Sequence, residues 1–219
     1  MTFNKEKYDA ILGDGLCAGL NDYSRGLVCI EAAIAIASGE PLNDHPACVY
    51  NRLSGLSIKL NDSNWSSPEA RATGLYKLGL AQLGTRHITP PDLDYFDLYL
   101  ANKIITQRVL PVLKEKYAKQ TTEQLLQKLQ EPDACMKLEV ISQYCEPVVG
   151  NFLGRVYNLL STCDYINAVA SVNREITGYS ICNDSDLRFL ADTLVEAIEA
   201  AGHSNEFDSI WKKEKKDEV

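Results

Sequence analysis

The stretch Val28-Cys-Ile-Glu-Ala-Ala-Ile-Ala-Ile-Ala37 carries a single charged side chain, Glu31, among residues that are otherwise apolar. A helix that is apolar on every face is normally buried. A carboxylate carried into that interior must be ionised and paired, or must raise its pKa and stay protonated, because an unpaired buried charge is too costly. The stretch therefore predicts a buried helix in which Glu31 is a polar anchor.

The composition bounds the class of protein. The chain has 219 residues, of which 45% are hydrophobic and 24% charged, which is typical of a globular protein. Its formal net charge of −8 disfavours nonspecific binding to nucleic acid or to anionic lipid, since both are driven by clustered Lys and Arg. The one lysine-dense run, at 212–216, is broken by Glu214, and we expect residues 211–219 to form a charged flexible tail.

Cellular location follows from the N-terminus and the cysteines. Residues 1–8 are polar and mixed in charge, without the apolar core of a secretory signal, and the longest apolar run is well below the ~20 residues that span a bilayer. The seven cysteines contain no CxxC pair, which indicates reduced thiols rather than a disulfide framework. We therefore expect a cytoplasmic protein that does not bind membranes.

Helix signals recur along the chain and strand signals do not. Ser66, Pro68 and Glu69 predict a capping box that opens a helix reaching to Gly84. Within it, Gly74 and Gly79 indicate a close approach by another helix. Further helices are expected at 3–12, 26–38, 46–60, 93–117, 121–130, 133–145, 147–160, 163–176 and 185–201, although 57–60 also alternates like a short strand.

These elements predict an all-α fold, an irregular bundle of about eight to ten helices. Pro111 lies inside the run from Leu93 to Tyr117 and predicts a kink near it or a break just before it. The last long helix should be capped by Asp184 or Ser185. Residues 1–210 are expected to form one helical domain, with a seam at 85–91 where two subdomains would meet.

Glu31 needs a cationic or hydrogen-bonding partner. Arg71 shares a helix side with Leu75 and Leu78, so it is the expected partner, with Arg52 and Lys59 as alternatives. A bidentate pair with Arg71 would fix the register of two helices while contributing little net stability, because desolvation offsets the attraction.

Two chemical interpretations start from Cys29 and His45. Cys29 lies near a predicted helix start, where the dipole lowers a thiol pKa, and His45 could serve as its base. Cysteine hydrolases usually carry that histidine on a sheet, which this sequence does not predict. Cys17, Cys29, His45 and Cys48 have ligand-like types, but no CxxC pair supports a metal site. We therefore expect a structural Cys29, with no catalytic residue, metal or cofactor.

The segment from Cys29 to Gly84 contains Cys-Ile-Glu-Ala-Ala33, Asn43-Asp-His-Pro46, Ile58-Lys-Leu-Asn-Asp62 and Trp65-Ser-Ser-Pro-Glu-Ala-Arg71. It resembles a segment of a group of uncharacterised bacterial helical proteins. The resemblance covers about a quarter of the chain and implies no activity. It does imply that one local unit contains Glu31, Asn61, Asp62, Trp65 and Arg71.

Because no enzyme motif is present, the leading hypothesis is an acidic, non-enzymatic module that binds other proteins or a second copy of itself. The alternative is an enzyme or small-ligand-binding protein with a polar site around Glu31, His45, Asn61, Asp62 and Arg71. Cys29 and Trp65 are further candidates for that site. Convergence of these groups on an open pocket would favour the alternative, whereas a sealed Glu31–Arg71 pair would favour the binding module.

Overall fold

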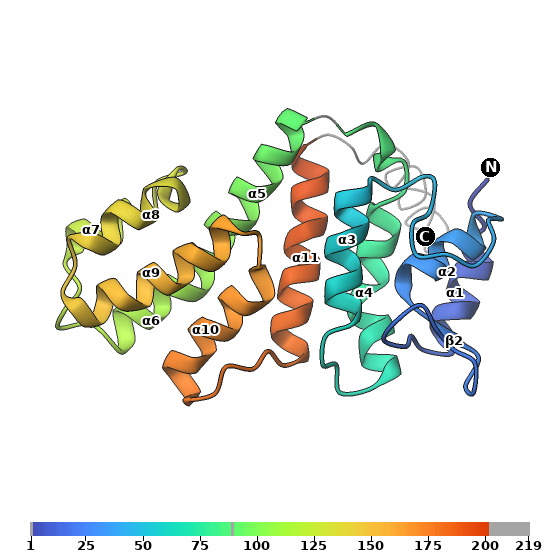
Figure 1. The fold of residues 1–219 in the computed structure, drawn as a ribbon, viewed down its shortest axis with the longest axis horizontal. Helices are drawn as coiled ribbons and strands as arrows, with labels where there is room; N and C mark the ends of the chain where they lie inside the picture. Colours follow the sequence, from blue (N-terminus) through green and yellow to red (C-terminus); the bar gives the residue numbers. More distant parts are fainter. Residues whose placement is uncertain (1, 89, 202–219) are drawn as a thin grey trace, which may run out of the picture. The chain divides into compact units, whose positions relative to one another are not determined.

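The computed structural model describes residues 2–88 and 90–201, without the side chains of residues 90–94. The chain divides into two compact units: unit 1 consists of Met1–Leu93 and Asn183–Val219, and unit 2 of Asp94–Cys182. The structure is 65% helical with almost no strand, which confirms the predicted all-α bundle of about ten helices (Figure 1). The predicted tail at 211–219 lies outside the described residues.

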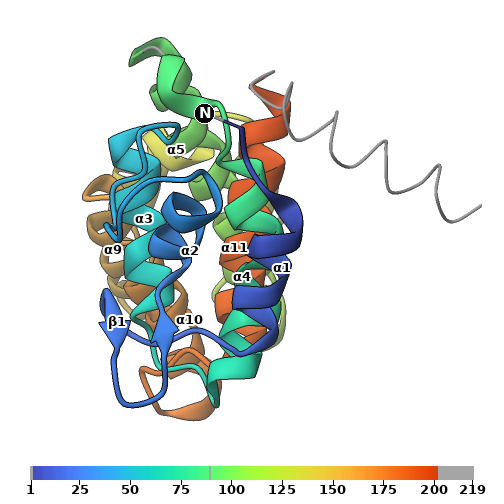
Figure 2. The same cartoon turned by 90° about the vertical axis from the view of Figure 1, so that its right-hand side faces the viewer.

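Unit 1 is arranged around one helix. Its elements are α1 (Lys5–Gly13), β1 (Asn21–Asp22), β2 (Leu27–Val28), α2 (Ile30–Ala37), α3 (Asn51–Asn61), α4 (Pro68–Ala81), the short 3₁₀ helix η1 (Thr85–His87) and α11 (Asp184–Ala200). Helix α4 contacts α1, α2, α3 and α11, so it forms the centre of the unit (Figure 2). Strands β1 and β2 form a small antiparallel hairpin in which Asn21 lies opposite Val28.

Helix α2 is buried as its composition predicts. All its residues except Ile36 are buried. The helix begins at Ile30 rather than at residue 26, because Leu27 and Val28 pair in the hairpin. Cys29 caps it, with its Sγ accepting a hydrogen bond from the backbone N–H of Ala32 at 3.3 Å.

The start of α4 differs by one residue from the prediction. Ser67, not Ser66, is the N-cap, and its Oγ accepts from the Ala70 N–H at 3.1 Å. The reason is that Pro68 occupies the first helical position, which makes the preceding residue the cap. Ser66 instead donates its backbone N–H and its hydroxyl to the carboxylate of Asp184, next to the start of α11.

The glycines of α4 mark close approaches. A Cβ at Gly79 would collide with the Tyr8 hydroxyl of α1 and press on Ile30 of α2, which confirms the predicted approach by another helix. At Gly74 the neighbour is the ring of Trp65, from the loop before α4. Small residues therefore let α4 pack at the centre of unit 1.

Unit 2 is also helical. Its elements are α5 (Pro90–Ile104), which begins within the range of unit 1, the π-helical segment η2 (Ile105–Val109), α6 (Leu110–Glu115), α7 (Glu123–Lys128), α8 (Ala134–Gln143), α9 (Pro147–Ser161) and α10 (Tyr165–Thr177). Helix α9 packs against both α8 and α10. The expected kink or break near Pro111 takes the form of η2, a widened turn that accommodates a residue without an N–H.

Helix α11 begins one residue earlier than predicted. Asn183 is its cap and forms a capping box with Asp186, instead of Asp184 or Ser185 acting as the cap. In the described part of the chain, no helix has both the length and the apolar character needed to cross a membrane. In the described part of the chain, none of the seven cysteines forms a disulfide.

Candidate functional site

Glu31 lies in a sealed polar pocket inside unit 1. It projects from the first turn of α2, has 0% of its surface exposed, and faces Ser54 and Ser57 of α3 and Gln82 after α4. The Gln82 amide donates from Nε2 to the Ser57 hydroxyl at 3.2 Å. Neither carboxyl oxygen of Glu31 has a well-formed hydrogen bond among the described residues. The carboxyl group is thus surrounded by polar groups but is not ion-paired.

Burial raises the pKa of Glu31 to about 7. Desolvation is the main cause, and the nearby Ser57, Gln82 and Ser54 side chains offset part of it. Near neutral pH this carboxyl group therefore exists in both protonation states. It is the protonated form that suits a buried pocket without a cation.

The expected pair between Glu31 and Arg71 is not formed. Arg71 donates from Nη1 to the carbonyl of Leu16 at 2.8 Å and from Nη2 to the carbonyl of Ser63 at 3.5 Å. Its Nε–H has no partner among the described residues. The pairing prediction was wrong because loop carbonyls, which carry no sequence signal, occupy the guanidinium group.

Asn61 and Asp62 connect three segments of unit 1. The Asn61 amide donates to the carbonyl of Cys17 at 2.8 Å and to Asp62 Oδ1 at 2.9 Å, and it accepts from the Ile30 N–H at 3.2 Å. Asp62 Oδ1 also accepts from the Gly19 N–H at 2.7 Å. These bonds tie two segments to the end of α3: the start of α2 and the loop before the hairpin. The role of Asn61 and Asp62 is therefore structural.

Trp65 is part of the core. Its indole N–H donates to the carbonyl of Leu60 at 2.8 Å, and its ring packs on Gly74. The side chain is buried, so its amphipathic ring is satisfied within the fold.

The geometry of Cys29 and His45 does not form a nucleophile–base pair. The Cys29 thiol is buried and bonded to its own helix, and burial raises its pKa to about 12. His45 is on the surface, with Nδ1 3.4 Å from the Ser54 hydroxyl and Nε2 3.8 Å from Asp44. The described residues contain no cluster of three or more His, Cys, Asp or Glu side chains arranged to hold a metal ion.

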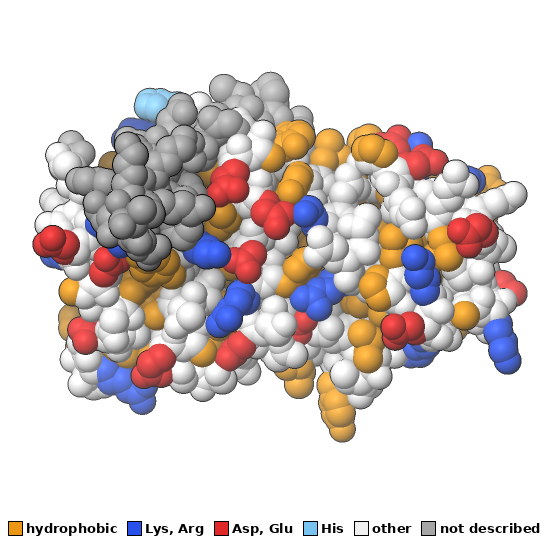
Figure 3. Space-filling view, turned by 180° about the vertical axis from the view of Figure 1, so that it is seen from behind, with side chains coloured by type: hydrophobic (Ala, Val, Ile, Leu, Met, Phe, Trp, Pro, Cys, Tyr) orange, Lys and Arg blue, Asp and Glu red, His pale blue; other side chains and the backbone are white. Residues whose placement is uncertain are grey.

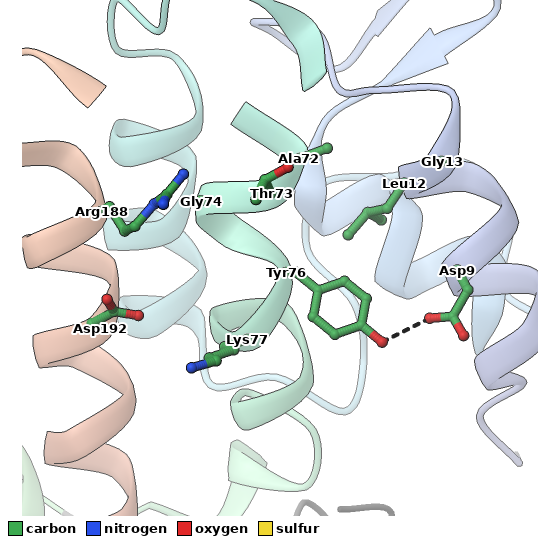
Figure 4. Close-up of a pocket in the computed structure, with 10 residues that line it drawn as sticks. All are labelled: Asp9, Leu12, Gly13, Ala72, Thr73, Gly74, Tyr76, Lys77, Arg188 and Asp192. Atoms are coloured by element: carbon green, nitrogen blue, oxygen red, sulfur yellow. Dashed lines mark hydrogen bonds between the residues drawn. The ribbon is translucent and has the colours of Figure 1, made fainter. Parts of the chain in front are cut away.

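Sequence reasoning missed an open groove on unit 1. It has a volume of about 510 Å³ and lies over α4, between α1 and α11 (Figure 4). On one side the Tyr76 hydroxyl donates to Asp9 at 2.9 Å; on the other lie Lys77, Arg188 and Asp192. Charges of both signs surround an apolar floor, and none of the predicted site residues lines this groove.

A second missed feature is a row of apolar side chains on α8, in unit 2. Met136 and Val140 of α8 are 63% and 54% exposed, and Tyr144, the residue that caps the C-terminus of α8, is 85% exposed. Their spacing of four residues places Met136 and Val140 on one side of the helix, and Tyr144 follows at its end. We call these three residues the α8 face. Its spacing was visible in the sequence, but which side of α8 packs on α9 was not.

No protein-family model, curated protein or solved structure matches the chain.

Proposed function

We propose that the protein is a cytoplasmic, non-enzymatic interaction module that binds a protein partner through the α8 face. The observation that carries the proposal is the exposure of three large apolar side chains at a four-residue spacing, two on α8 and one at its C-cap. On the face shown in Figure 3, hydrophobic side chains emerge in small groups among charged and polar ones. Large exposed apolar residues that share a face are informative, because single ones occur on every protein.

The α8 face borders two hollows of unit 2. Val140 and Tyr144 line one of about 490 Å³, together with residues of α7 and of the loop before it. Met136 lines another of about 540 Å³, next to Ala101 and Tyr157. A partner that covers α8 can therefore insert apolar side chains on either side of the helix, which is the arrangement of interfaces dominated by a few anchors.

Charge favours a partner that combines acidic and apolar residues. Lys119 and Lys128 line the first hollow and form no ion pair among the described residues. Lys137 of α8, by contrast, already pairs with Glu131 and Asp133, each at 2.8 Å. Two unpaired lysines face one carboxylate, Glu146, in that hollow.

The net charge of −8 repels an acidic partner only while the two proteins are still far apart. At physiological ionic strength the screening length is about 8 Å, so the charges next to the contact decide the binding. The local lysines therefore set the preference for an acidic segment.

The alternative, a small-ligand or enzyme site, has weaker support. Glu31 and Asn61 are 0% exposed, and Cys29 is bonded within its own helix. The candidate residues form separate structural contacts rather than one open pocket, which a catalytic site requires.

A peptide-display selection against the full chain tests the proposal. We expect enriched peptides that alternate apolar with Asp or Glu residues and bind in a saturable way. The triple variant Met136→Gln, Val140→Thr, Tyr144→Gln should weaken them by about tenfold or more, since interface anchors each contribute more than about 1 kcal/mol. Charge reversal of Lys119 and Lys128 to Glu should change the selection toward basic peptides.

A matched triple variant on another exposed apolar set, Ile176→Gln, Tyr179→Gln, Ile181→Gln, is the control and should leave peptide binding unchanged. Failure to enrich such peptides, or equal loss in both triple variants, would contradict the proposal. Sedimentation measures whether the wild-type chain and the α8 triple variant are monomers or dimers. If the wild type is a dimer and the α8 triple variant is a monomer, the α8 face binds a second copy of this chain and not a different protein.

A further inference from the structure

A hollow on unit 1 lies between the β1–β2 hairpin and the start of α4. We call it the hairpin hollow; its volume is about 600 Å³, and its lining includes Cys17, Asp22, Arg25, Pro68 and Arg71. Small-molecule sites typically have volumes of about 300–1,000 Å³, so the hollow can hold a metabolite-sized ligand.

Arg71 contributes a buried cation to the lining of the hairpin hollow. Only 9% of its surface is exposed, yet its hydrogen bonds go to two neutral carbonyls, those of Leu16 and Ser63. No carboxylate accepts a hydrogen bond from it among the described residues, and its Nε–H is unpartnered. Asp62 and Asp184 act on its charge without a hydrogen bond to it among the described residues. An anion in the hollow would therefore give this buried cation a direct partner.

Arg25 adds a second cation from the hairpin. Its side chain is exposed, and its Nε lies 3.7 Å from Asp22 Oδ2. Asp22 is already engaged locally, because its Oδ1 accepts from the backbone N–H and the hydroxyl of Ser24 at 3.0 and 2.6 Å. The charged groups that line the hollow are therefore two guanidinium groups and one carboxylate, with an excess of positive charge.

We propose that the hairpin hollow binds the oxyanion group of a small ligand, with Arg71 and Arg25 as its cationic partners. Guanidinium groups suit phosphate and carboxylate because their planar N–H donors match two oxygens at once. The anion supplies a hydrogen-bonded counter-charge, which the nearby Asp62 and Asp184 do not. This site is separate from the α8 face, and neither proposal depends on the other.

Titration of the full chain with inorganic phosphate, followed through the ¹⁵N side-chain signals of Arg71 and Arg25, tests the site. Parallel titrations with acetate and with chloride at equal ionic strength separate the possible sources. Saturable binding of phosphate but not acetate identifies a phosphate-bearing ligand, and the reverse identifies a carboxylate. In either case chloride should produce no saturable change.

Variants locate the binding. Arg25→Ala removes an exposed side chain and should weaken the anion by about fivefold or more, whereas Asp22→Asn keeps the acceptor for Ser24 and should tighten it by a similar factor. Arg71→Lys keeps the charge but loses the planar donor set, so it should also weaken binding. Arg174→Ala, an exposed arginine of unit 2, is the control. Responses no larger than those to chloride, or affinities that Arg25→Ala and Asp22→Asn leave unchanged, would overturn the proposal.

Discussion

Two regions depart from the usual rule that polar side chains are exposed and apolar ones are buried. They are the interior of unit 1 and the surface of α8 in unit 2, and they depart from it in opposite ways. Unit 1 buries Glu31, Asn61 and Arg71, whereas α8 exposes Met136 and Tyr144. The fold explains the burial of Asn61, because its amide bonds to backbone groups of two other segments. The exposed row on α8 has no such structural explanation. The difference teaches that a conspicuous buried polar residue such as Asn61 has a role in folding, whereas the exposed apolar residues of the α8 face make no comparable contact within the fold.

The largest effect is expected at Asn61, the most connected of the buried polar residues. Asn61→Ala would leave the Ile30 N–H and the Cys17 carbonyl without a partner, and each unsatisfied buried group costs about 1–3 kcal/mol. We expect a loss of about 4 kcal/mol in the free energy of unfolding. Denaturant unfolding measures it, with Asn64→Ala, an exposed asparagine in the next loop, as the control. Similar small losses in both variants would show that the buried network is not what holds unit 1 together.

The next effect is a pH dependence that comes from Glu31. Its pKa is about 7 in the folded chain and 4.5 in the unfolded one, so below about pH 4.5 the group is protonated in both states. As the pH rises toward 7, the unfolded state releases the proton first, and the folded state is destabilised by about 3 kcal/mol, at 1.36 kcal/mol per pKa unit. Above pH 7 this contribution stays constant.

Glu31→Gln removes that titration while preserving the shape of the side chain. Unfolding of the wild-type chain and the variant at pH 5 and pH 8 should therefore show a fall in stability that is about 2.5 kcal/mol larger for the wild type, because part of the effect is already present at pH 5. Equal pH dependence in the two proteins would mean that Glu31 is ionised and stabilised in the fold.

A smaller effect is expected at Arg71. Replacing it with Ala removes two hydrogen bonds to loop carbonyls and should cost about 2 kcal/mol. Because Arg71 and Glu31 are not paired, the effects of Arg71→Ala and Glu31→Gln on the free energy of unfolding should be additive, with a coupling energy below about 0.5 kcal/mol. A coupling energy several times larger in the double-mutant cycle would show that Arg71 and Glu31 form an ion pair after all.

The α8 face should have the smallest effect on stability. Substitutions at exposed sites usually change the free energy of unfolding by less than about 0.5 kcal/mol, so the α8 triple variant should remain within about 1 kcal/mol of the wild type. Leu138→Ala, on the buried side of the same helix, should cost about 3 kcal/mol. If the triple variant were as unstable as Leu138→Ala, the face would be part of the fold and not a docking surface.

These contrasts also show what the sequence could reveal. The burial of α2 and the close approach at Gly79 could be predicted, since both follow from residue size and polarity within one segment. The predicted cap of α4 was wrong by one residue. A kink or break near Pro111 was predicted, but not that it would be the π-helical segment η2. The partner of Arg71 could not be predicted, because backbone carbonyls of loops leave no pattern in the side chains. The α8 row was present in the spacing, but only the packing of α9 against α8 shows which side is free.

The central proposal is that a protein partner binds at the α8 face and not on unit 1. Titration of the ¹⁵N-labelled full chain with an acidic–apolar peptide from the display selection tests it most directly, through changes in the backbone amide shifts. The account predicts saturable changes concentrated in residues 119–128 and 134–146. Changes concentrated instead in residues 9–13, 72–77 and 188–192, which line the groove of Figure 4, would contradict it.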